Sequence, residues 1–210
     1  ASYSTTSLLL ALLSNLLSAS EALNVVLAGG TGPVGQALAS SLQPTDKVTI
    51  LCRNAFLAGS MVRASSQFGW VGESFLQKFP NVQLRDWDGG DLLDIVGQDW
   101  VGWQQDTLAN ADVVVHLYGG YTEQRVMACE RLVRESYAVN RKAMHITVAP
   151  IEEDLDIVAP MCAKAFKIQR VKQCEDMVSS NCQNSVCLKI EANRMEQNCK
   201  DMLAVIDKLR

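Results

Sequence analysis

Three glycines spaced three residues apart follow a short apolar run near the start of the chain, in VVLAGGTGPVG at residues 25–35. The apolar run predicts a buried strand, and Pro33 suits the first turn of a helix, where a missing N–H costs nothing. Such a turn can hold a nucleotide phosphate on the free N–H groups of the helix. Gly29 would allow the tight turn, Gly32 the approach of a pyrophosphate and Gly35 close helix packing. The alternative is a loop that keeps this shape and binds nothing.

The composition is that of a folded globular domain, because 48% of the 210 residues are hydrophobic and 20% are charged. The formal net charge is -4 and no long basic run occurs, which argues against a nucleic-acid partner. An apolar run at residues 8–17 is too short for a transmembrane helix, although it leaves peripheral membrane association open. Residues 1–22 have two interpretations: the remnant of an organellar targeting peptide, or a helix packed on the domain at residues 23–210. The first predicts a plastid or mitochondrion, and the second leaves the cytoplasm open.

The seven cysteines include no pair in Cys-x-x-Cys spacing, so the sequence predicts neither a zinc site nor a thioredoxin-type site. Five of the seven follow residue 160, which leaves a disulfide in that region open. We favour the alternative that the thiols are small buried side chains in a reducing compartment.

Segments with strand character alternate with helical segments from residue 23 to residue 210. We expect strands at 23–28, 47–52, 81–87, 111–120, 145–150 and 185–190, and helices at 33–42, 122–144, 163–180 and 194–210. The secondary structure of residues 54–80 is harder to assign from the sequence, and we expect one helix and a loop there. The alternation predicts a doubly wound, Rossmann-like α/β fold with about six parallel strands in the order 3-2-1-4-5-6.

Four segments together resemble the atypical and extended short-chain dehydrogenase/reductases, over about residues 23–195. They are the glycine motif, VTILCRN at 48–54, DVVVHLYGG at 112–120 and YAVN at 137–140. The resemblance implies an NAD(P)-binding Rossmann domain, in which Asp91 and Leu92 would neighbour the adenine. The cofactor-binding residues that it implies are Gly29, Gly30, Thr31, Gly32, Pro33, Val34, Gly35, Arg53, Asn54, Asp91, Leu92, Leu117, Tyr118 and Gly119.

The end of the second predicted strand carries an arginine where an NAD-binding domain usually has an acid. That acid would lie about 20 residues after the motif and hold the ribose hydroxyl. The residue here is Arg53, and an arginine can pair with a 2′-phosphate. The sequence therefore predicts NADP(H) over NAD(H), and the alternative is that Arg53 is an ordinary surface charge.

The catalytic residues of the family have no counterpart in the sequence. Active members use a Tyr-x-x-x-Lys pair after the fifth strand, preceded by a serine, and the tyrosine is the general acid/base. The resemblance puts Lys167 where the tyrosine belongs, Val171 where the lysine belongs and Ala149 at the serine. None of the four tyrosines has lysine four residues later, although Tyr121 is followed by Arg125 at that spacing. Residues 191–210 also predict no counterpart of the substrate segment that follows the sixth strand in the family.

These departures predict a nucleotide-binding shell without a catalytic residue. It would sense NADP(H), or serve as an accessory subunit with protein partners in a respiratory or photosynthetic assembly. A second interpretation is an NADP-dependent oxidoreductase or epimerase that uses other groups, with His116 and Tyr118 as candidates. His116 can equally be a packed strand residue. The sequence shows no partner for Cys129 or His145, and we assign neither a role.

Overall fold

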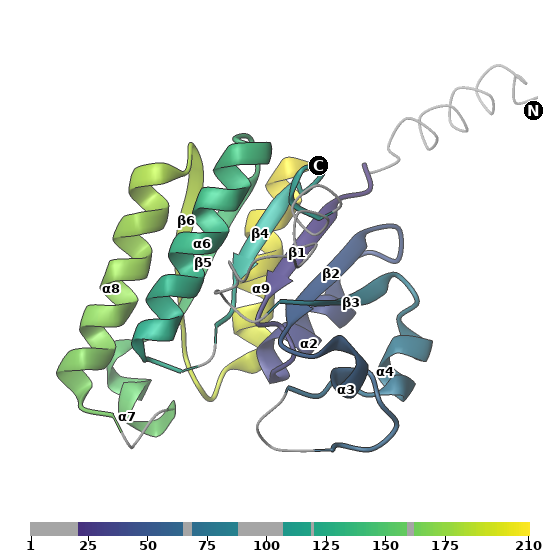
Figure 1. Ribbon diagram of the computed structural model, residues 1–210, viewed down its shortest axis with the longest axis horizontal. Helices are drawn as coiled ribbons and strands as arrows, with labels where there is room; N and C mark the ends of the chain where they lie inside the picture. The colour runs from purple at the N-terminus through teal and green to yellow at the C-terminus, as the bar shows by residue number, and fades with distance from the viewer. Residues whose placement is uncertain (1–20, 65–68, 88–106, 119, 159–161) are drawn as a thin grey trace, which may run out of the picture.

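Six parallel strands form the central sheet, in the order β3-β2-β1-β4-β5-β6 (Figure 1). The computed structural model describes residues 21–64, 69–87, 107–118, 120–158 and 162–210. The strands are β1 (Asn24–Ala28), β2 (Lys47–Cys52), β3 (Val82–Asp86), β4 (Val113–His116), β5 (Met144–Pro150) and β6 (Asn184–Ile190). This order confirms the predicted doubly wound α/β fold.

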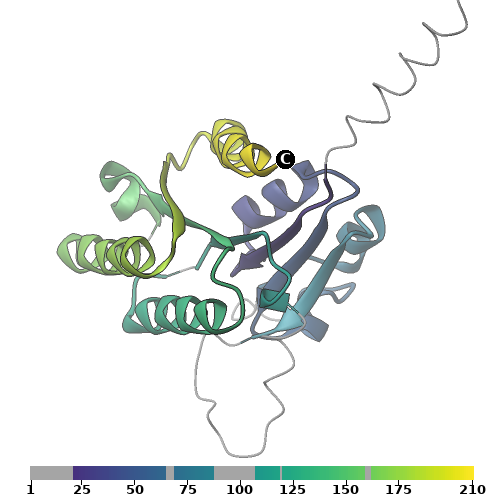
Figure 2. The same cartoon turned by 90° about the horizontal axis from the view of Figure 1, so that it is seen from above.

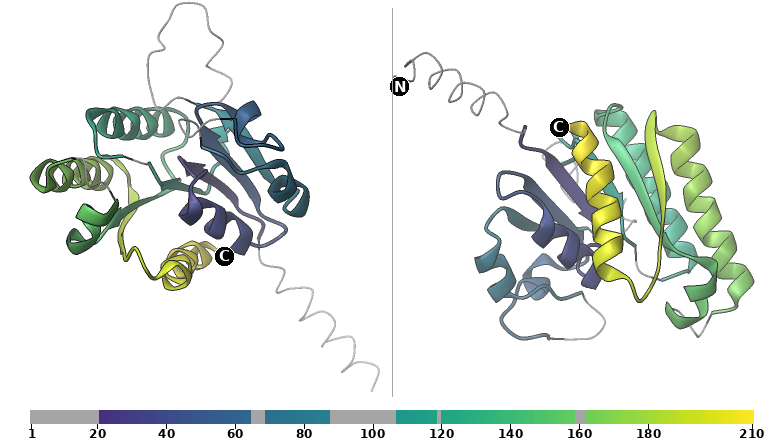
Figure 3. Two further views of the ribbon diagram at one scale, coloured as in Figure 1. Left: turned by 90° about the horizontal axis from the view of Figure 1, so that it is seen from below. Right: turned by 180° about the vertical axis from the view of Figure 1, so that it is seen from behind.

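Helices cover both faces of the sheet (Figures 2 and 3). One face carries α2 (Pro33–Ser41) and α9 (Met195–Ile206), which contact each other. The opposite face carries α6 (Glu123–Val139) and α8 (Lys164–Asn181), which also lie side by side. The shorter helices are α3 (Ala55–Ala58), α4 (Glu73–Lys78), α7 (Leu155–Val158) and the 3-10 turns Glu152–Asp154 and Asp207–Leu209.

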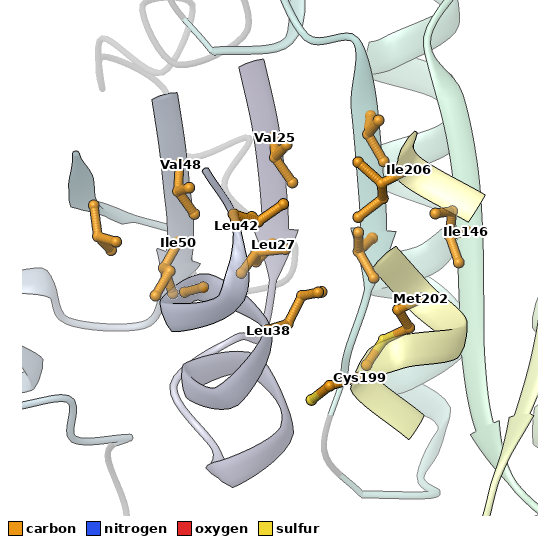
Figure 4. Packing of buried hydrophobic residues seen from close by; sticks show 14 of the residues in the cluster. Val25, Leu27, Leu38, Leu42, Val48, Ile50, Ile146, Cys199, Met202 and Ile206 are labelled. Carbon is orange, nitrogen blue, oxygen red and sulfur yellow. The ribbon is translucent and has the colours of Figure 1, made fainter. Parts of the chain in front are cut away.

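The alternation of side chains along the strands divides the core between the two faces. Val25 and Leu27 of β1 pack with Leu38 of α2 and Met202 of α9, all buried (Figure 4). The side chains between them, such as Val26, face α6 on the other side of the sheet. Strands covered on both faces need apolar residues at nearly every position, which explains the continuous apolar runs of the central strands.

Several predicted boundaries were wrong. The helix expected over 122–144 ends at Val139, because Asn140 turns to an extended backbone and its side chain donates to the carbonyl of Ala111 at 2.8 Å. The strand expected over 111–120 is only Val113–His116, and the described residues of the stretch 54–80 hold two short helices instead of one. The interpretations of residues 1–22 stay predictions, since residues 1–20 lie outside the described part. Within that part, no helix is both long enough and apolar enough to cross a membrane.

Candidate functional site

The glycine turn leaves β1 at the carboxyl end of the sheet, between the ends of β2 and β4. Gly29 has a φ of +82°, a left-handed conformation that favours glycine. A Cβ atom there would lie 2.9 Å from the carbonyl oxygen of Leu117, so a side chain would also collide with the segment after β4. The amide of Gly29 donates to the carbonyl of Leu51 at 3.0 Å, which fixes the turn to β2.

The other two glycines of the motif have opposite surroundings. A Cβ atom on Gly35 would lie 2.2 Å from the carbonyl oxygen of Gly30, so the first turn of α2 packs directly on the glycine turn. A Cβ atom on Gly32 would meet no described atom within 4 Å. Gly32 is also the N-cap of α2, and no described side chain caps this helix end. The motif therefore presents open space and free N–H groups at Gly32, the arrangement that an anionic phosphate requires.

A segment from the 54–80 region is fixed to the glycine turn. The side-chain amide of Gln36 donates both to the carbonyl of Thr31 at 2.8 Å and to that of Trp70 at 3.0 Å. Gly69 packs on the Thr31 side chain so closely that a Cβ atom would lie 1.8 Å from its hydroxyl oxygen. Thr31 is thus held in place from two sides. Sequence reasoning did not find this contact, because its partners are separated by a stretch without regular periodicity.

Arg53 and Asn54 both follow β2, but their side chains differ in exposure and in hydrogen bonding. Arg53 is exposed and lies at the carboxyl edge of the sheet. Asn54 is the N-cap of α3, and its side-chain oxygen accepts the amide of Leu57 at 2.8 Å. Asn54 therefore has a local structural role that the resemblance did not indicate, whereas Arg53 is free to reach a ligand.

An acidic residue that sequence reasoning did not consider also lies at this edge. Asp86 ends β3 in register with Cys52, and its carboxylate accepts the amide of Ala55 at 2.6 Å. Burial and this carboxylate together raise the pKa of the Cys52 thiol to about 11. Strand register alone could have indicated the position, because the ends of β2 and β3 meet at one edge.

The segment after β4 faces the glycine turn, but its aromatic side chain does not. Leu117 donates its amide to the carbonyl of Ala28 at 2.8 Å and packs on the core below α2. The Tyr118 hydroxyl lies 2.9 Å from Nδ1 of His116 and donates to the carbonyl of Ala128 in α6 at 3.4 Å. Its polar group is therefore inside the protein, beneath α6. The remaining predicted residues Asp91, Leu92 and Gly119 lie outside the described residues.

A buried hydrogen-bonded chain continues from Tyr118 through both histidines. Nε2 of His116 lies 2.9 Å from Nδ1 of His145, and Nε2 of His145 lies 3.0 Å from the Ser136 hydroxyl. Burial lowers the pKa of His145 to about 4, and burial together with His145 and Arg125 lowers the pKa of His116 well below its usual value. Burial also raises the pKa of the Tyr118 hydroxyl. The chain is thus a set of neutral groups that satisfy one another inside the fold.

The sequence-based view that His145 and Cys129 lack partners was wrong. His145 contacts His116, and the Cys129 sulfur lies 3.9 Å from Nδ1 of His116. The two histidines share a face of the sheet because His116 pairs with Thr147, two residues after His145. Alternate residues of a strand point to the same face of the sheet, so the pairing of β4 with β5 could have predicted this contact. The packed-residue interpretation of His116 agrees with its burial.

The positions that the resemblance assigns to the family's catalyst lie near one another, with Ala149 in β5 and both Lys167 and Val171 in α8. Ala149 and Val171 are buried there against Leu155 and Tyr121. Lys167 is fully buried, and its ammonium group donates to the Leu155 carbonyl at 2.9 Å and to the Asp156 carboxylate at 3.0 Å. Lys167 thus fixes α7 to α8.

No group of three His, Cys, Asp or Glu side chains among the described residues could hold a metal ion. No protein-family model matches the sequence, and no curated protein matches it as a relative.

Solved structures do share the fold. A protein from Corynebacterium glutamicum assigned to the short-chain dehydrogenase/reductases has 18% identity and a TM-score of 0.51, over 87% of this chain and 91% of that one. The Bordetella bronchiseptica enzyme WbmF, in complex with NAD+ and UDP, has 15% identity and a TM-score of 0.51, over 81% of this chain and 49% of that one. The yeast methylglyoxal/isovaleraldehyde reductase, complexed with NADPH, has 11% identity and a TM-score of 0.51, over 79% and 53%.

These likenesses show that the chain has the Rossmann fold that these three proteins share. At such low identity they show the fold alone. The chain spans about half the length of two of these three proteins.

Proposed function

We propose that this chain binds a dinucleotide of the NADP(H) type at the carboxyl edge of its sheet and acts through binding rather than turnover. The observation that carries the proposal is the contrast within the glycine motif, where Gly35 has no room for a side chain and Gly32 faces open space. This space lies over the uncapped start of α2, where a pyrophosphate would meet N–H groups. Proteins of the same fold have been solved with NAD+ and with NADPH.

Arg53 should determine the choice of nucleotide. Because it is exposed at the end of β2, it can pair with a 2′-phosphate, and a charge-assisted contact of this kind contributes about 1.5–3 kcal/mol. We expect NADP(H) to bind more tightly than NAD(H) by about tenfold or more. Titration calorimetry with both nucleotides tests this.

The substitution Arg53→Ala should remove that preference while leaving NAD(H) affinity nearly unchanged. Arg63→Ala is the matched control, because Arg63 is an exposed arginine on the same connection between β2 and β3. Equal affinities for the two nucleotides in the unmodified protein would refute the role of Arg53.

The surroundings of the family's catalytic positions support a role without turnover. Ala149 and Val171 offer no proton, and the ammonium group of Lys167 is already bonded to α7. His116 and Tyr118, the sequence-based candidates for an alternative catalyst, direct their polar groups to each other beneath α6. A missing general acid typically costs about 10²–10⁴-fold in rate.

We therefore expect no reductase turnover with carbonyl compounds or nucleotide sugars at saturating NADP(H). The measurement is nicotinamide absorbance over a broad substrate panel, with a reductase of the same fold as the positive control. Steady turnover that the purified protein retains through a further chromatographic step would contradict this prediction.

One observation favours the second candidate function, an oxidoreductase or epimerase with non-standard groups. Tyr121 brings a phenol into the cluster of Ala149 and Val171, and the Arg125 guanidinium lies 5.2 Å from the centre of its ring. A cation near a phenol lowers its pKa, although burial raises the pKa of Tyr121 more than Arg125 lowers it. If turnover is found, its loss in Tyr121→Phe would identify this group, and its loss in Tyr118→Phe would identify the buried chain instead.

An accessory role requires a partner surface, and the connection after β2 offers exposed apolar side chains. Phe56, Met61 and Val62 are 83%, 79% and 75% exposed. Large apolar side chains gathered on a surface favour contact with another protein. We propose that the chain works within a larger organellar assembly, in a plastid or mitochondrion. Stoichiometric co-purification with such an assembly, and its loss when Phe56 and Met61 are changed to serine, tests the proposal.

A further inference from the structure

Two buried cysteines face each other where α6 packs on α8. Cys129 of α6 and Cys174 of α8 belong to one cluster with Val133 and Val178, and all four side chains are buried. The Cys129 thiol donates to the carbonyl of Cys174 at 3.8 Å, and the Cys174 thiol donates to the carbonyl of Arg125 at 3.9 Å. Each thiol is therefore bonded to the backbone of the facing helix, inside one buried cluster.

A buried cation that has no carboxylate partner among the described residues lies beside these thiols. The Arg125 guanidinium donates to the carbonyls of Tyr118 at 2.5 Å, Gly120 at 3.3 Å and Val148 at 3.3 Å. Arg125 is 6% exposed, its Nε has no hydrogen-bond partner among the described residues, and none of their carboxylates forms an ion pair with it. A buried charge without an opposite charge is costly, so this site favours an anion next to Arg125.

Cys174 is the group that can supply this anion. A hydrogen bond from Cys129 and the charge of Arg125 lower the pKa of the Cys174 thiol, against the opposing effects of burial and of Glu175. The same contact with Cys174, together with burial, raises the pKa of Cys129. The pair thus combines a thiol that ionises more readily with one that stays protonated, and the thiolate is the nucleophilic form of cysteine.

We propose that Cys129 and Cys174 are a redox-active dithiol that a hydroperoxide converts into a disulfide between α6 and α8. The Cys174 thiolate attacks one peroxide oxygen, the O–O bond breaks, and the leaving oxygen takes a proton to become water when the oxidant is hydrogen peroxide. This first step oxidises the Cys174 sulfur to a sulfenic acid. The Cys129 thiol then attacks that sulfur, loses its proton and releases a second water, which completes the disulfide.

The disulfide would act on the candidate nucleotide edge through Arg125. Oxidation removes the negative charge beside the guanidinium, which holds the carbonyls of Tyr118 and Gly120 on the segment that faces Gly29. We expect this segment to shift and the dinucleotide affinity to fall by about fivefold or more, within the usual range of coupling between two sites. This second effect rests on the proposed function, whereas formation of the disulfide does not.

The first test uses the full chain and hydrogen peroxide, followed by thiol blocking and peptide mass mapping without reduction. We expect a linked pair of peptides containing Cys129 and Cys174, a mass loss of two hydrogens, and reversal by dithiothreitol. Because both thiols are buried, hydrogen peroxide should oxidise them more slowly than the blocking reagent alkylates the exposed Cys187. A map in which Cys129 and Cys174 stay reduced, or in which either is joined to Cys182, overturns the proposal.

Single variants separate the roles of the two sulfurs. In Cys129→Ser the Cys174 sulfenic acid should persist and react with dimedone, and in Cys174→Ser this adduct should be absent from position 129. Cys199→Ser is the matched control, because Cys199 is a buried thiol on the opposite face of the sheet. Dimedone labelling of Cys129 instead would overturn the assignment of the attacking thiol.

Nucleotide titration of the reduced and oxidised chain then tests the coupling. If neither form binds a dinucleotide, the proposed function fails. The peptide map still shows whether Cys129 and Cys174 form a disulfide. If both forms bind equally, the redox pair stands and its coupling to the nucleotide edge is refuted.

Discussion

Acidification from pH 7 to pH 5 should lower the free energy of unfolding by about 4 kcal/mol, or about 2 kcal/mol for each of two buried histidines. His116 and His145 are the only two histidines of the chain, and the fold keeps both neutral. The expected result is a urea unfolding midpoint that falls steeply between these pH values. Aspartate and glutamate contribute less in this window, because their usual pKa values lie near 4.

The direction follows from which state binds more protons. The folded pKa of His145 is about 4 and that of His116 is also lowered, whereas an unfolded histidine titrates near 6.5. Between these values the unfolded chain takes up protons that the folded chain does not, so stability rises with pH. The stabilisation is fully present above pH 6.5 and is lost as the pH falls toward 4.

His145→Gln isolates one member of the pair. Glutamine can donate and accept hydrogen bonds in the chain between Ser136 and His116, but it does not titrate. The loss of stability between pH 7 and pH 5 should therefore halve. A loss in the unmodified protein below about 1 kcal/mol would show that the histidines titrate normally and that the buried chain is not held as described.

Gly35→Ala should destabilise the fold by about 3 kcal/mol, a cost at the upper end for adding a methyl group to a packed site. The new Cβ atom would lie within 2.5 Å of three backbone atoms of Gly30, and backbone cannot move aside as the end of a flexible side chain can. Relief requires α2 to move away from the glycine turn. Urea unfolding monitored by circular dichroism measures the loss.

Gly32→Ala is the matched control, because its Cβ atom would enter open space and its φ of -79° suits alanine. Its unfolding free energy should change by less than about 1 kcal/mol. If the proposed function is right, dinucleotide affinity should nevertheless fall by about tenfold, since the methyl group occupies the approach of the pyrophosphate. Equal stability of the two variants would contradict the close packing of Gly35, and unchanged affinity in Gly32→Ala would count against the nucleotide site.

Most of the fold could be predicted because the central strands of its sheet are covered on both sides. A strand such as β4, in which all four residues are buried and three are valines, has no face toward solvent, so the apolar run in the sequence marks it directly. The predicted boundaries were wrong where the hydrogen bonds of a single side chain determine where a helix ends. The end of α6 depends on the bonds from Asn140 to Leu108 and Ala111, residues far away in the sequence, and no local periodicity reports such bonds.

The candidate site was predicted in part for the same reason. Gly29, Gly32 and Gly35 are neighbours in sequence, so their conformational roles could be deduced from spacing. The pairing of His116 with His145 and of Cys129 with Cys174 depends on strand register and on helix packing, which arise only in the folded chain. Asp86 was missed for this reason too, since its place beside Cys52 is a property of the β2–β3 register.

The order of the strands also determines how the chain can assemble. β1 lies in the middle of the sheet, and one of its two neighbours, β4, starts at Val113, so Val25 must find a partner far along the chain. Contacts between distant residues slow folding, because a long loop must close before the pairing stabilises it. Until β4 arrives, the apolar edge of β1 has an open side on which strands of other molecules can pair. Refolding should therefore depend on protein concentration, with dilute conditions or a chaperone protecting the central strand.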